Sequence, residues 1–487
     1  MVQIGQWDRF EEAFEHRGPV QDPYGDVRLE VTYRRPDGST VDFWGFYDGG
    51  DTWRIRFMPD QIGSWEYSVR FSDGSPGTQG TFECVASDIP GMISQDRDNP
   101  AWFGFSGRGR VLVRSLHVGD CFFADEDNSV TGERWDPEMR RAFLEWAGVQ
   151  GYNMLSIASH YLNRDSEGRG QGWLTPDLWD GERGAPWPEE YQRLERVMDD
   201  LSDRRMMVYP FAGFFGRDST APRDPDEQEL YIRYTLARLG PYWNLLFMVG
   251  GPEPRLGSKA YLSEDDVDRL GGMIASLDVF GHPPWASYVT LQGPKTVDRK
   301  ELGETILRNR RPGKPLYAQE TLWPGNVLHA RRAGRDYSDD DIRKNAYVML
   351  ISGAAINFGD MDGLSSTGFS GRPDLGLKEQ ARHDAIQEVW DFFETIPFQR
   401  MVPRQDLVDT GHCLAEEGER ILVYLELSGD VRVRLGDTVC RAEWINARHT
   451  RDRRFAGTVK DGDRLRSPDD GGDWLLDLVR VDGGVLA

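Results

Sequence analysis

The stretch Met206–Gly251 reads MMVYPFAGFFGRDSTAPRDPDEQELYIRYTLARLGPYWNLLFMVGG. It opens on an apolar run (206–215), continues into a helical segment (225–240) and closes on a second apolar run (245–251). Two short apolar runs joined through a helix are typical of a βαβ unit, whose parallel strands are buried on both faces. The stretch therefore predicts neighbouring parallel strands with a helix packed against them.

The same rhythm continues on both sides of this stretch. YNMLSIASHY (152–161) precedes PEEYQRLERVMDDLSDRR (188–205), in which the apolar residues share one helical face. Those residues are Tyr191, Leu194, Val197, Met198 and Leu201. Further alternating segments are CFFADED (121–127), DPEMRRAFLEWAGVQ (136–150), SEDDVDRLGGMIASL (263–277), WASYVT (285–290), ELGETILRNRR (301–311), PLYAQE (315–320), DDIRKNAYVMLISG (340–353), AAINFGD (354–360) and EQARHDAIQEVWDFFETI (379–396).

These alternating units predict an α/β fold, a (β/α)8 TIM barrel over residues 110–402. A doubly wound open sheet is the rival, but neither GxGxxG nor GxxxxGK[ST] opens a helix. One place fits the barrel poorly. Only residues 291–314 separate the predicted strands at 285–290 and 315–320, so the sixth strand has no clear position, or the barrel is abbreviated there.

Short alternating strands flank the barrel on both sides. Residues 1–88 carry runs such as LEVTYRRPDG (29–38), split by Gly, Pro and Asp turns, and predict an N-terminal antiparallel, Ig-like β-sandwich. A linker rich in Pro, Gly and Asp follows at 89–109. Residues 403–487 return to period-2 patterning and predict a C-terminal antiparallel β-sandwich.

The composition limits the partners. Eighty-one acidic against 58 basic residues give a formal charge of −23, a field that repels nucleic acid. Only seven basic residues are Lys, which fits either a halophilic source or a genome that favours Arg codons. No apolar run is long enough to span a membrane, and no signal peptide is visible, so a cytoplasmic location is expected, with secretion after processing as the alternative. The sequence predicts no oligomeric state.

Cysteine usage points the same way. Cys84, Cys121, Cys413 and Cys440 are too few and scattered for a disulfide framework or a CxxC metal site. Cys413 and Cys440 share one region and could pair, but free thiols are the preferred interpretation. No HExxH occurs, and ADEDN (124–128) lacks the Gly and distal Glu of a calcium loop. We therefore expect neither metal nor cofactor.

Two glutamates directly follow apolar strands. Glu253 stands in FMVGGPEP on the fourth predicted strand and Glu320 in PLYAQE on the seventh. A carboxylate at this position costs desolvation free energy unless it is paired or serves a function. Barrel enzymes carry their reactive groups at these strand ends. Two carboxyl groups facing one cavity are what glycoside cleavage needs. A strand-end salt bridge is the structural interpretation of either residue.

Glutamates on strands four and seven resemble those of the retaining glycoside hydrolases in clan A, the large barrel clan that includes cellulases and mannanases. VDFWGFYDGGDTWRIRFMPDQIGSWEYSV (41–69) is similar to the small sandwich that precedes such barrels in polysaccharide-degrading proteins. CRAEWINARHTRD (440–452) with GDWLLDLV (472–479) is similar to the C-terminal module of apiosidase-like hydrolases that carries a collagen-binding label. The resemblance covers nearly the whole chain.

The resemblance implies that Glu253 is the acid/base and Glu320 the nucleophile of a retaining hydrolase acting on oligo- or polysaccharides. The clan usually has Asn before the acid/base, to bind the sugar 2-hydroxyl, whereas this chain has Pro252. Asn163 or Asn357 could supply that contact instead.

Other polar and aromatic residues at strand ends suit a carbohydrate, which presents both hydroxyl groups and flat apolar faces. The predicted substrate-binding residues are Asp125, His160, Tyr161, Asn163, Phe214, Trp285, Trp323, Asn357 and Asp360. Each single aromatic could equally belong to the core.

Two alternatives remain open. One is a non-catalytic carbohydrate-binding barrel, which the missing Asn before Glu253 favours. The other is a polysaccharide lyase, for which His160 and Tyr161 would serve. The distance between the carboxyl groups of Glu253 and Glu320 separates these hypotheses from a hydrolase.

Overall fold

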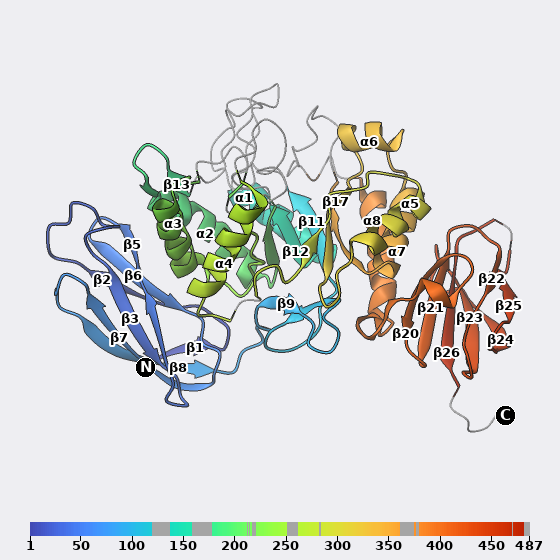
Figure 1. Ribbon diagram of the computed structural model, residues 1–487, viewed down its shortest axis with the longest axis horizontal. Helices are drawn as coiled ribbons and strands as arrows, with labels where there is room; N and C mark the ends of the chain where they lie inside the picture. The colour runs from blue at the N-terminus through green and yellow to red at the C-terminus, as the bar shows by residue number, and fades with distance from the viewer. Residues whose placement is uncertain are drawn as a thin grey trace.

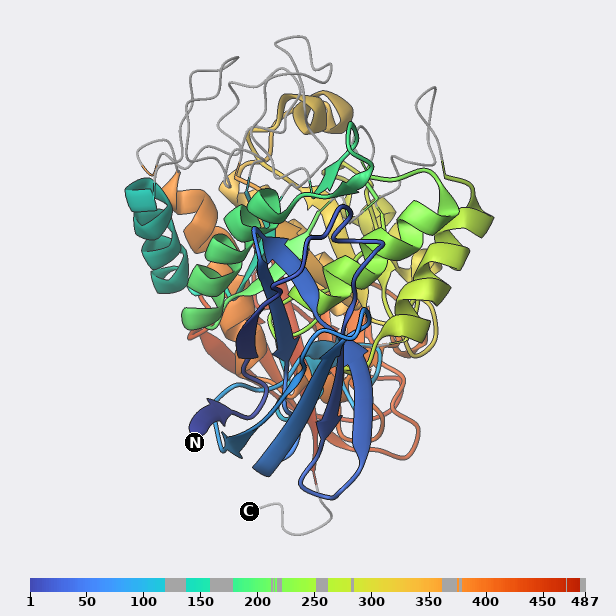
Figure 2. The ribbon, with the colours of Figure 1, turned by 90° about the vertical axis from the view of Figure 1, so that its left-hand side faces the viewer.

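A curled parallel sheet lies at the centre of the computed structural model, with the N-terminal sheets at one end and the C-terminal sheets at the other (Figure 1). Figure 2 looks along the molecule from the N-terminal end, where helices surround the central sheet. The structure describes residues 1–118, 137–157, 178–211, 213, 215–216, 221–250, 262–281, 284–360, 375, 379–469 and 471–481. No helix among these residues is long and apolar enough to cross a membrane.

Six parallel strands form the central sheet, in the order β15-β12-β11-β18-β17-β16. Nearly all their residues are buried, as expected of strands that helices cover. The strands are β11 (Arg114–Val118), β12 (Met154–Ile157), β15 (Met207–Pro210), β16 (Val289–Thr290), β17 (Leu316–Leu322) and β18 (Ala354–Phe358). A parallel bridge from Val208 to Leu245 adds the LLFMVG segment next to β15.

The predicted alternation of strands and helices is confirmed within the described residues, and the sheet is barrel-like in its curvature. The segment predicted as the first strand, CFFADED (121–127), lies outside the described residues, and β11 precedes it. The stretch between the predicted strands at 285–290 and 315–320, which is short for a helix, a strand and another helix, is abbreviated. Residues 291–315, all of them described, hold one helix and an isolated bridge between Arg311 and Lys314, but no further strand of the sheet. Strand β16 therefore pairs directly with β17, with Val289 opposite Leu316.

Helices connect these strands. The apolar face predicted for 188–205 is confirmed, because Tyr191, Leu194, Val197, Met198 and Leu201 are all buried. The helices are α1 (Pro137–Val149), α2 (Pro188–Asp203), α3 (Pro225–Leu239), α4 (Glu264–Leu277), α5 (Arg299–Asn309), α6 (Val327–Ala333), α7 (Asp339–Ile351) and α8 (Gln380–Glu394). A short hairpin, β13 (Trp179–Asp180) with β14 (Ala185–Pro186), directly precedes α2.

The N-terminal region folds into two sheets, with the orders β1-β8-β7-β3-β4 and β2-β6-β5. Their strands are β1 (Val2–Gly5), β2 (Phe10–Glu15), β3 (Leu29–Arg34), β4 (Thr40–Trp44), β5 (Phe46–Gly49), β6 (Thr52–Phe57), β7 (Gly63–Phe71) and β8 (Thr78–Val85). Strand β1 runs parallel to β8, so this region is not wholly antiparallel as expected. Aromatic pairs such as Phe10 with Phe82 join the two sheets, with ring centroids 4.1 Å apart.

Gly45 marks the point where the chain passes from one N-terminal sheet to the other. Strands β4 and β5 lie on either side of Gly45. A Cβ atom there would lie 2.4 Å from the carbonyl oxygen of Arg54 and 2.7 Å from Cδ2 of Leu29. Only glycine allows this close approach.

The segment after β8 forms the antiparallel pair β9 (Ile93–Gln95) and β10 (Phe103–Phe105), which lies below the central sheet in Figure 1. Trp102 donates its indole N–H to the carbonyl of Met401 at 2.9 Å, and the Asn99 amide donates to the carbonyl of Gln399 at 2.8 Å. These contacts tie the segment to the chain just after α8.

The C-terminal region has a six-stranded sheet, in the order β19-β20-β21-β26-β23-β24, and the pair β22-β25, all antiparallel. The strands are β19 (Val402–Pro403), β20 (His412–Glu416), β21 (Arg420–Leu425), β22 (Asp430–Arg432), β23 (Cys440–Asn446), β24 (Arg453–Val459), β25 (Arg464–Arg466) and β26 (Trp474–Arg480), with 3-10 turns at Phe398–Arg400 and Gln405–Leu407.

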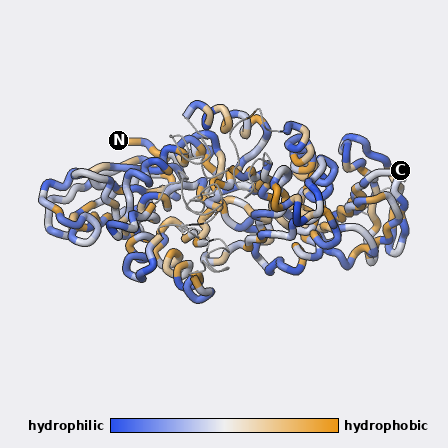
Figure 3. The backbone as a smooth tube through the Cα atoms, turned by 90° about the horizontal axis from the view of Figure 1, so that it is seen from above, coloured by the Kyte–Doolittle hydropathy of each residue, from blue (hydrophilic) through white to orange (hydrophobic). Residues whose placement is uncertain are grey.

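Apolar segments gather in the interior and hydrophilic turns at the periphery (Figure 3). One face of the C-terminal sheet packs on α7, where the rings of Tyr347 and Tyr424 stack with centroids 5.0 Å apart. Cys84, Cys413 and Cys440 are buried free thiols, so Cys413 and Cys440 are not paired.

Candidate active site

Strand β17 carries Glu320 toward its carboxyl end. The pairing between β17 and β18 shifts register between Ala318 and Leu322, so the pairing is irregular around Glu320. Irregularities of strand pairing, β-bulges among them, are common next to active sites. Glu320 is only 7% exposed, so its carboxylate lies in an environment that favours close hydrogen-bond partners.

Among the described residues, three side chains hold the Glu320 carboxylate. Gln292 donates from Nε2 to Oε2 at 2.7 Å. Nε2 of His329 lies 3.1 Å from Oε1, and Nζ of Lys295 lies 3.3 Å from the same oxygen. Both carboxylate oxygens are therefore engaged by the protein.

These contacts keep Glu320 ionised. Burial raises the pKa of the Glu320 carboxyl, but the hydrogen bond from His329, the charge of Lys295 and the hydrogen bond from Gln292 lower it more. The net pKa is below the ordinary value of 4.5. Burial also lowers the pKa of His329, which favours its neutral form. A neutral His329 with its proton on Nε2 donates to Glu320.

The partners of Glu320 come from two segments beside β17. Gln292 and Lys295 lie in the loop that leads from β16 to α5. His329 lies in the first turn of α6, which begins after Asn326, whose side chain accepts hydrogen bonds from the amides of Leu328 and His329. Sequence reasoning missed all three partners.

Trp323 is buried rather than open to a ligand. Its ring stacks on His117 at 4.2 Å and on His329 at 5.3 Å between centroids. Gly359 fits against it so closely that a Cβ atom would lie 2.6 Å from Cγ of Trp323. Trp323 is fully buried with His117 and His329 stacked on its ring, so it packs around His329. Its stacking on a sugar stays a prediction.

Asn357 lies inside the curled sheet. Its amide donates to the carbonyl of Gln319 at 2.7 Å, and its carbonyl accepts from the Ser115 hydroxyl at 3.0 Å. It is fully buried, so these bonds join the strands that flank the register shift. These bonds give Asn357 a structural role, and its contact with a sugar hydroxyl stays a prediction.

Asp360 follows β18 and has a close partner on each carboxylate oxygen. Arg382 donates to Oδ1 at 3.0 Å, and Nε2 of His383 lies 2.9 Å from Oδ2. The other ring nitrogen of His383 lies 2.6 Å from the Tyr152 hydroxyl. Asp360 is 1% exposed and belongs to a buried network that joins β18 to α8, and its contact with substrate stays a prediction.

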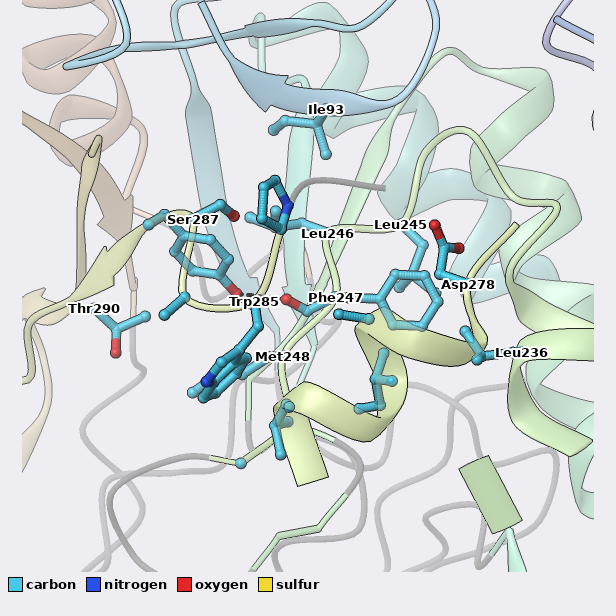
Figure 4. Close-up of a pocket in the computed structure, with 18 residues that line it drawn as sticks. Ile93, Leu236, Leu245, Leu246, Phe247, Met248, Asp278, Trp285, Ser287 and Thr290 are labelled. Carbon is cyan, nitrogen blue, oxygen red and sulfur yellow. Dashed lines mark hydrogen bonds between the residues drawn. The ribbon is translucent and has the colours of Figure 1, made fainter. Parts of the chain in front are cut away.

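Trp285 lines a separate cavity of about 390 Å³ at the side of the sheet (Figure 4). The cavity lies between the LLFMVG segment, helix α4 and residues 284–290. Trp285 packs flat on Gly271 and donates its indole N–H to Asp268 at 3.2 Å. None of the residues that hold Glu320 lines this cavity.

The remaining predicted site residues lie outside the described residues. They are Asp125, His160, Tyr161, Asn163, Phe214 and Glu253. Within the part of the chain that the structure describes, no three His, Cys, Asp or Glu residues converge as metal ligands would.

A family model described as "Domain of unknown function (DUF5060)" matches residues 3–72, which is the first part of the N-terminal region. No curated protein sequence matches the chain significantly.

Several solved structures share the fold. A "putative glycoside hydrolase" from Bacteroides vulgatus aligns with a TM-score of 0.74 at 18% identity, covering 99% of this chain and 100% of that one. A protein named "Glycoside hydrolase" aligns at 0.61 and 13% identity, over 81% and 98% of the two chains. A glycoside hydrolase family 5 protein from B. vulgatus aligns at 0.60 and 15%, over 80% and 94%. At such identities the likeness concerns the fold.

Proposed function

We propose that this protein is a retaining glycoside hydrolase in which Glu320 is the nucleophile. The observation that carries the proposal is the environment of Glu320, a buried carboxylate at a register shift near the strand end that His329, Gln292 and Lys295 hold in its ionised form. An ionised carboxylate can attack an anomeric carbon, and a low pKa makes it a good leaving group when water later cleaves the glycosyl ester.

Glu253 is the proposed acid/base. Glu253 lies three residues beyond Gly250, where the segment that joins the sheet at Leu245 ends. Strand ends on one side of such a sheet meet over one cavity, so a carboxyl group there would face Glu320. A retaining reaction requires about 5–5.5 Å between the two carboxyl groups. Pro252 takes the position where the clan has Asn, so the sugar 2-hydroxyl would need another partner.

The proposed substrate is an oligo- or polysaccharide. Three solved structures of similar fold carry glycoside hydrolase names, which supports this class without naming the sugar. We further infer a barrel short of one strand between residues 291 and 315, flanked by two sandwiches, with domain boundaries near 88, 109 and 402.

A non-catalytic carbohydrate-binding barrel is the second candidate. The observation that favours it is that both oxygens of Glu320 already have protein partners. In that case Glu320 would serve the packing of β17 and α6, and the chain would bind sugars without cleaving them.

A substrate screen separates the two candidates. Nitrophenyl pyranosides and furanosides, with plant and algal polysaccharides, are tested against the wild type and Glu320→Gln. We expect turnover by the wild type, a product that keeps the anomeric configuration of the substrate, and a loss of several powers of ten in Glu320→Gln. A folded Glu320→Gln variant that retains more than about a tenth of the activity contradicts the assignment.

Azide tests the role of Glu253. Glu253→Ala should lose most activity on substrates with poor leaving groups and much less on aryl glycosides, whose phenolate leaves without a proton. Azide should then react with the intermediate and give a glycosyl azide of retained configuration. Equal loss on both substrate types, with no azide product, would contradict the assignment.

A further inference from the structure

The N-terminal region meets the central region through a buried cluster of charged side chains. Glu195 of α2 accepts two hydrogen bonds from Arg56 of β6, at 2.7 and 3.0 Å. It accepts two more from Arg238 of α3, at 2.7 and 2.9 Å. Arg56 is 5% exposed, Glu195 6% and Arg238 0%. Water therefore does not separate the two regions here.

The remaining charges of the cluster come from the N-terminal sheets. Asp48 lies 2.8 Å from Arg238, and Glu11 pairs with Arg56. The Phe46 ring lies below both guanidinium groups, at 4.9 Å from Arg56 and 4.5 Å from Arg238. Separation of the two regions would leave buried charges without partners, which strongly disfavours independent movement.

The contacts continue upward to the hairpin β13–β14. Tyr24 of the N-terminal region donates its hydroxyl to the carbonyl of Pro186 in β14, at 2.8 Å. Its ring packs edge-on against Tyr47 and Tyr234, and Gln192 of α2 donates to the carbonyl of Asp48 at 3.1 Å. The hairpin directly precedes α2, so the start and the middle of this helix are both anchored to the N-terminal sheets.

The hairpin lies on the side of the sheet toward which the strands run. It occurs between β12 and α2, and residues that follow a strand and precede the next helix occupy the carboxyl-end face of a parallel sheet. In Figure 1 the hairpin and α6, which carries His329, lie on the same upper side. Glu320 reaches that face from β17.

We propose that the N-terminal region, which includes the residues that match the domain of unknown function, is a fixed positioning element of the substrate face. It holds the β13–β14 hairpin through Tyr24 and through the cluster of Arg56, Glu195 and Arg238, and it is not an independently moving carbohydrate-binding module. That this face binds substrate rests on the proposed glycoside hydrolase function. That the N-terminal region holds the hairpin rests on the contacts alone.

Hydrogen exchange of the full chain tests whether the N-terminal region holds the hairpin. Tyr24→Phe keeps the ring and removes the hydroxyl that binds Pro186. The loss of one such hydrogen bond should speed amide exchange in residues 178–187 by roughly fivefold. Tyr67→Phe, the same change in β7 away from the hairpin, should leave these amides unchanged. Unchanged exchange in Tyr24→Phe, or an equal change in the control, would overturn the proposal.

Thermal unfolding gives a second readout. If the N-terminal region is fixed, the full chain should show no separate transition for residues 1–88, and Gln192→Ala should also speed exchange in the hairpin. A separate early transition confined to the N-terminal peptides, followed by exchange, would overturn the proposal.

Kinetic measurements on a glycoside that the wild type cleaves test whether the hairpin acts at the substrate face. Tyr24→Phe should raise KM several-fold more than it lowers kcat, because a displaced hairpin weakens binding and leaves Glu320 in place. Faster exchange with unchanged KM would overturn the role at the substrate face. If the wild type cleaves no glycoside, the proposed function fails, whereas hydrogen exchange still decides whether the hairpin is held.

Discussion

Nε2 of His329 lies 3.1 Å from Oε1 of Glu320, although the two residues belong to different elements, α6 and β17. The His329 ring stacks on Trp323, so its orientation is fixed by packing. Nδ1 of His329 makes no hydrogen bond within the described part of the chain, which leaves Glu320 as its polar partner there. Substitution of His329 is therefore the most direct way to change the environment of the candidate nucleophile.

His329→Ala should lower kcat/KM by roughly ten- to a hundredfold, since a hydrogen bond to a charged group contributes about 1.5–3 kcal/mol. The variant should also move the acid limb of the pH–rate profile upward, because the hydrogen bond lowers the pKa of Glu320. His329→Gln, which can still donate, should recover part of both effects. An unchanged profile in His329→Ala would show that this contact does not tune Glu320.

Lys295→Met should raise the pKa of Glu320 by removing a positive charge 3.3 Å from Oε1. The pKa of Glu320 is depressed in the folded protein, so its stabilising effect is present above the ordinary value of 4.5 and is lost as the pH falls. The variant should therefore lose stability at neutral pH and shift its acid limb upward. Lys295→Arg is the matched control. Equal pH profiles for Met and Arg variants would contradict a role for the charge.

Glu195→Gln should destabilise the protein by about 3 kcal/mol at pH 7. Burial raises the pKa of Glu195, but Arg56 and Arg238 lower it more, from 4.5 to about 2. The stabilisation is fully present above about pH 4.5 and is lost as the pH falls toward 2. Chemical denaturation measures the free energy of unfolding of the wild type and of the variant at pH 7 and at pH 3. Glu189→Gln, an exposed change on the same helix, should cost little, and an equal loss in both variants would contradict the account.

Two neighbouring glycines of α4 test the placement of Trp285. A Cβ atom at Gly271 would lie 2.1 Å from Trp285, whereas nothing lies within 4 Å of one at Gly272. Gly272→Ala should stabilise the helix by about 0.5–1 kcal/mol, and Gly271→Ala should destabilise the protein by about 1–3 kcal/mol. Thermal melts compare them. Equal melting temperatures would place the Trp285 ring elsewhere.

The periodicity of the sequence was sufficient to predict the alternating strands and helices of the central sheet. Alternating apolar runs and an amphipathic face at Tyr191–Leu201 predicted the parallel sheet and α2, because burial on one face or both leaves a direct mark on residue order. The chain between β16 and β17 was correctly recognised as too short. The parallel pairing of β1 with β8 was missed, because residue alternation is the same in parallel and antiparallel edge strands.

The candidate site was predicted less completely. Glu320 was found because a carboxylate after an apolar strand is unusual. Lys295 and His329 were missed, since neither loop nor helix position reveals which long side chain turns toward β17. A Lys in a Lys-poor chain and a His nine residues after Glu320 were the available signals. Trp323 and Asn357 were placed on the right strands, but a sequence does not show which face of a strand end is covered.

The most direct test of the central claim is covalent trapping of Glu320. The wild type is incubated with activated 2-deoxy-2-fluoro glycosides of the sugars that it cleaves. The fluorine destabilises the oxocarbenium-like transition states of both steps, while the activated leaving group keeps formation of the glycosyl ester faster than its hydrolysis. Intact-protein mass spectrometry should show the addition of one fluoroglycosyl group, and peptide sequencing should place it on Glu320, with no adduct in Glu320→Gln. An adduct on another carboxylate, or cleavage with inversion of configuration and no adduct, would contradict the assignment of Glu320 as the nucleophile.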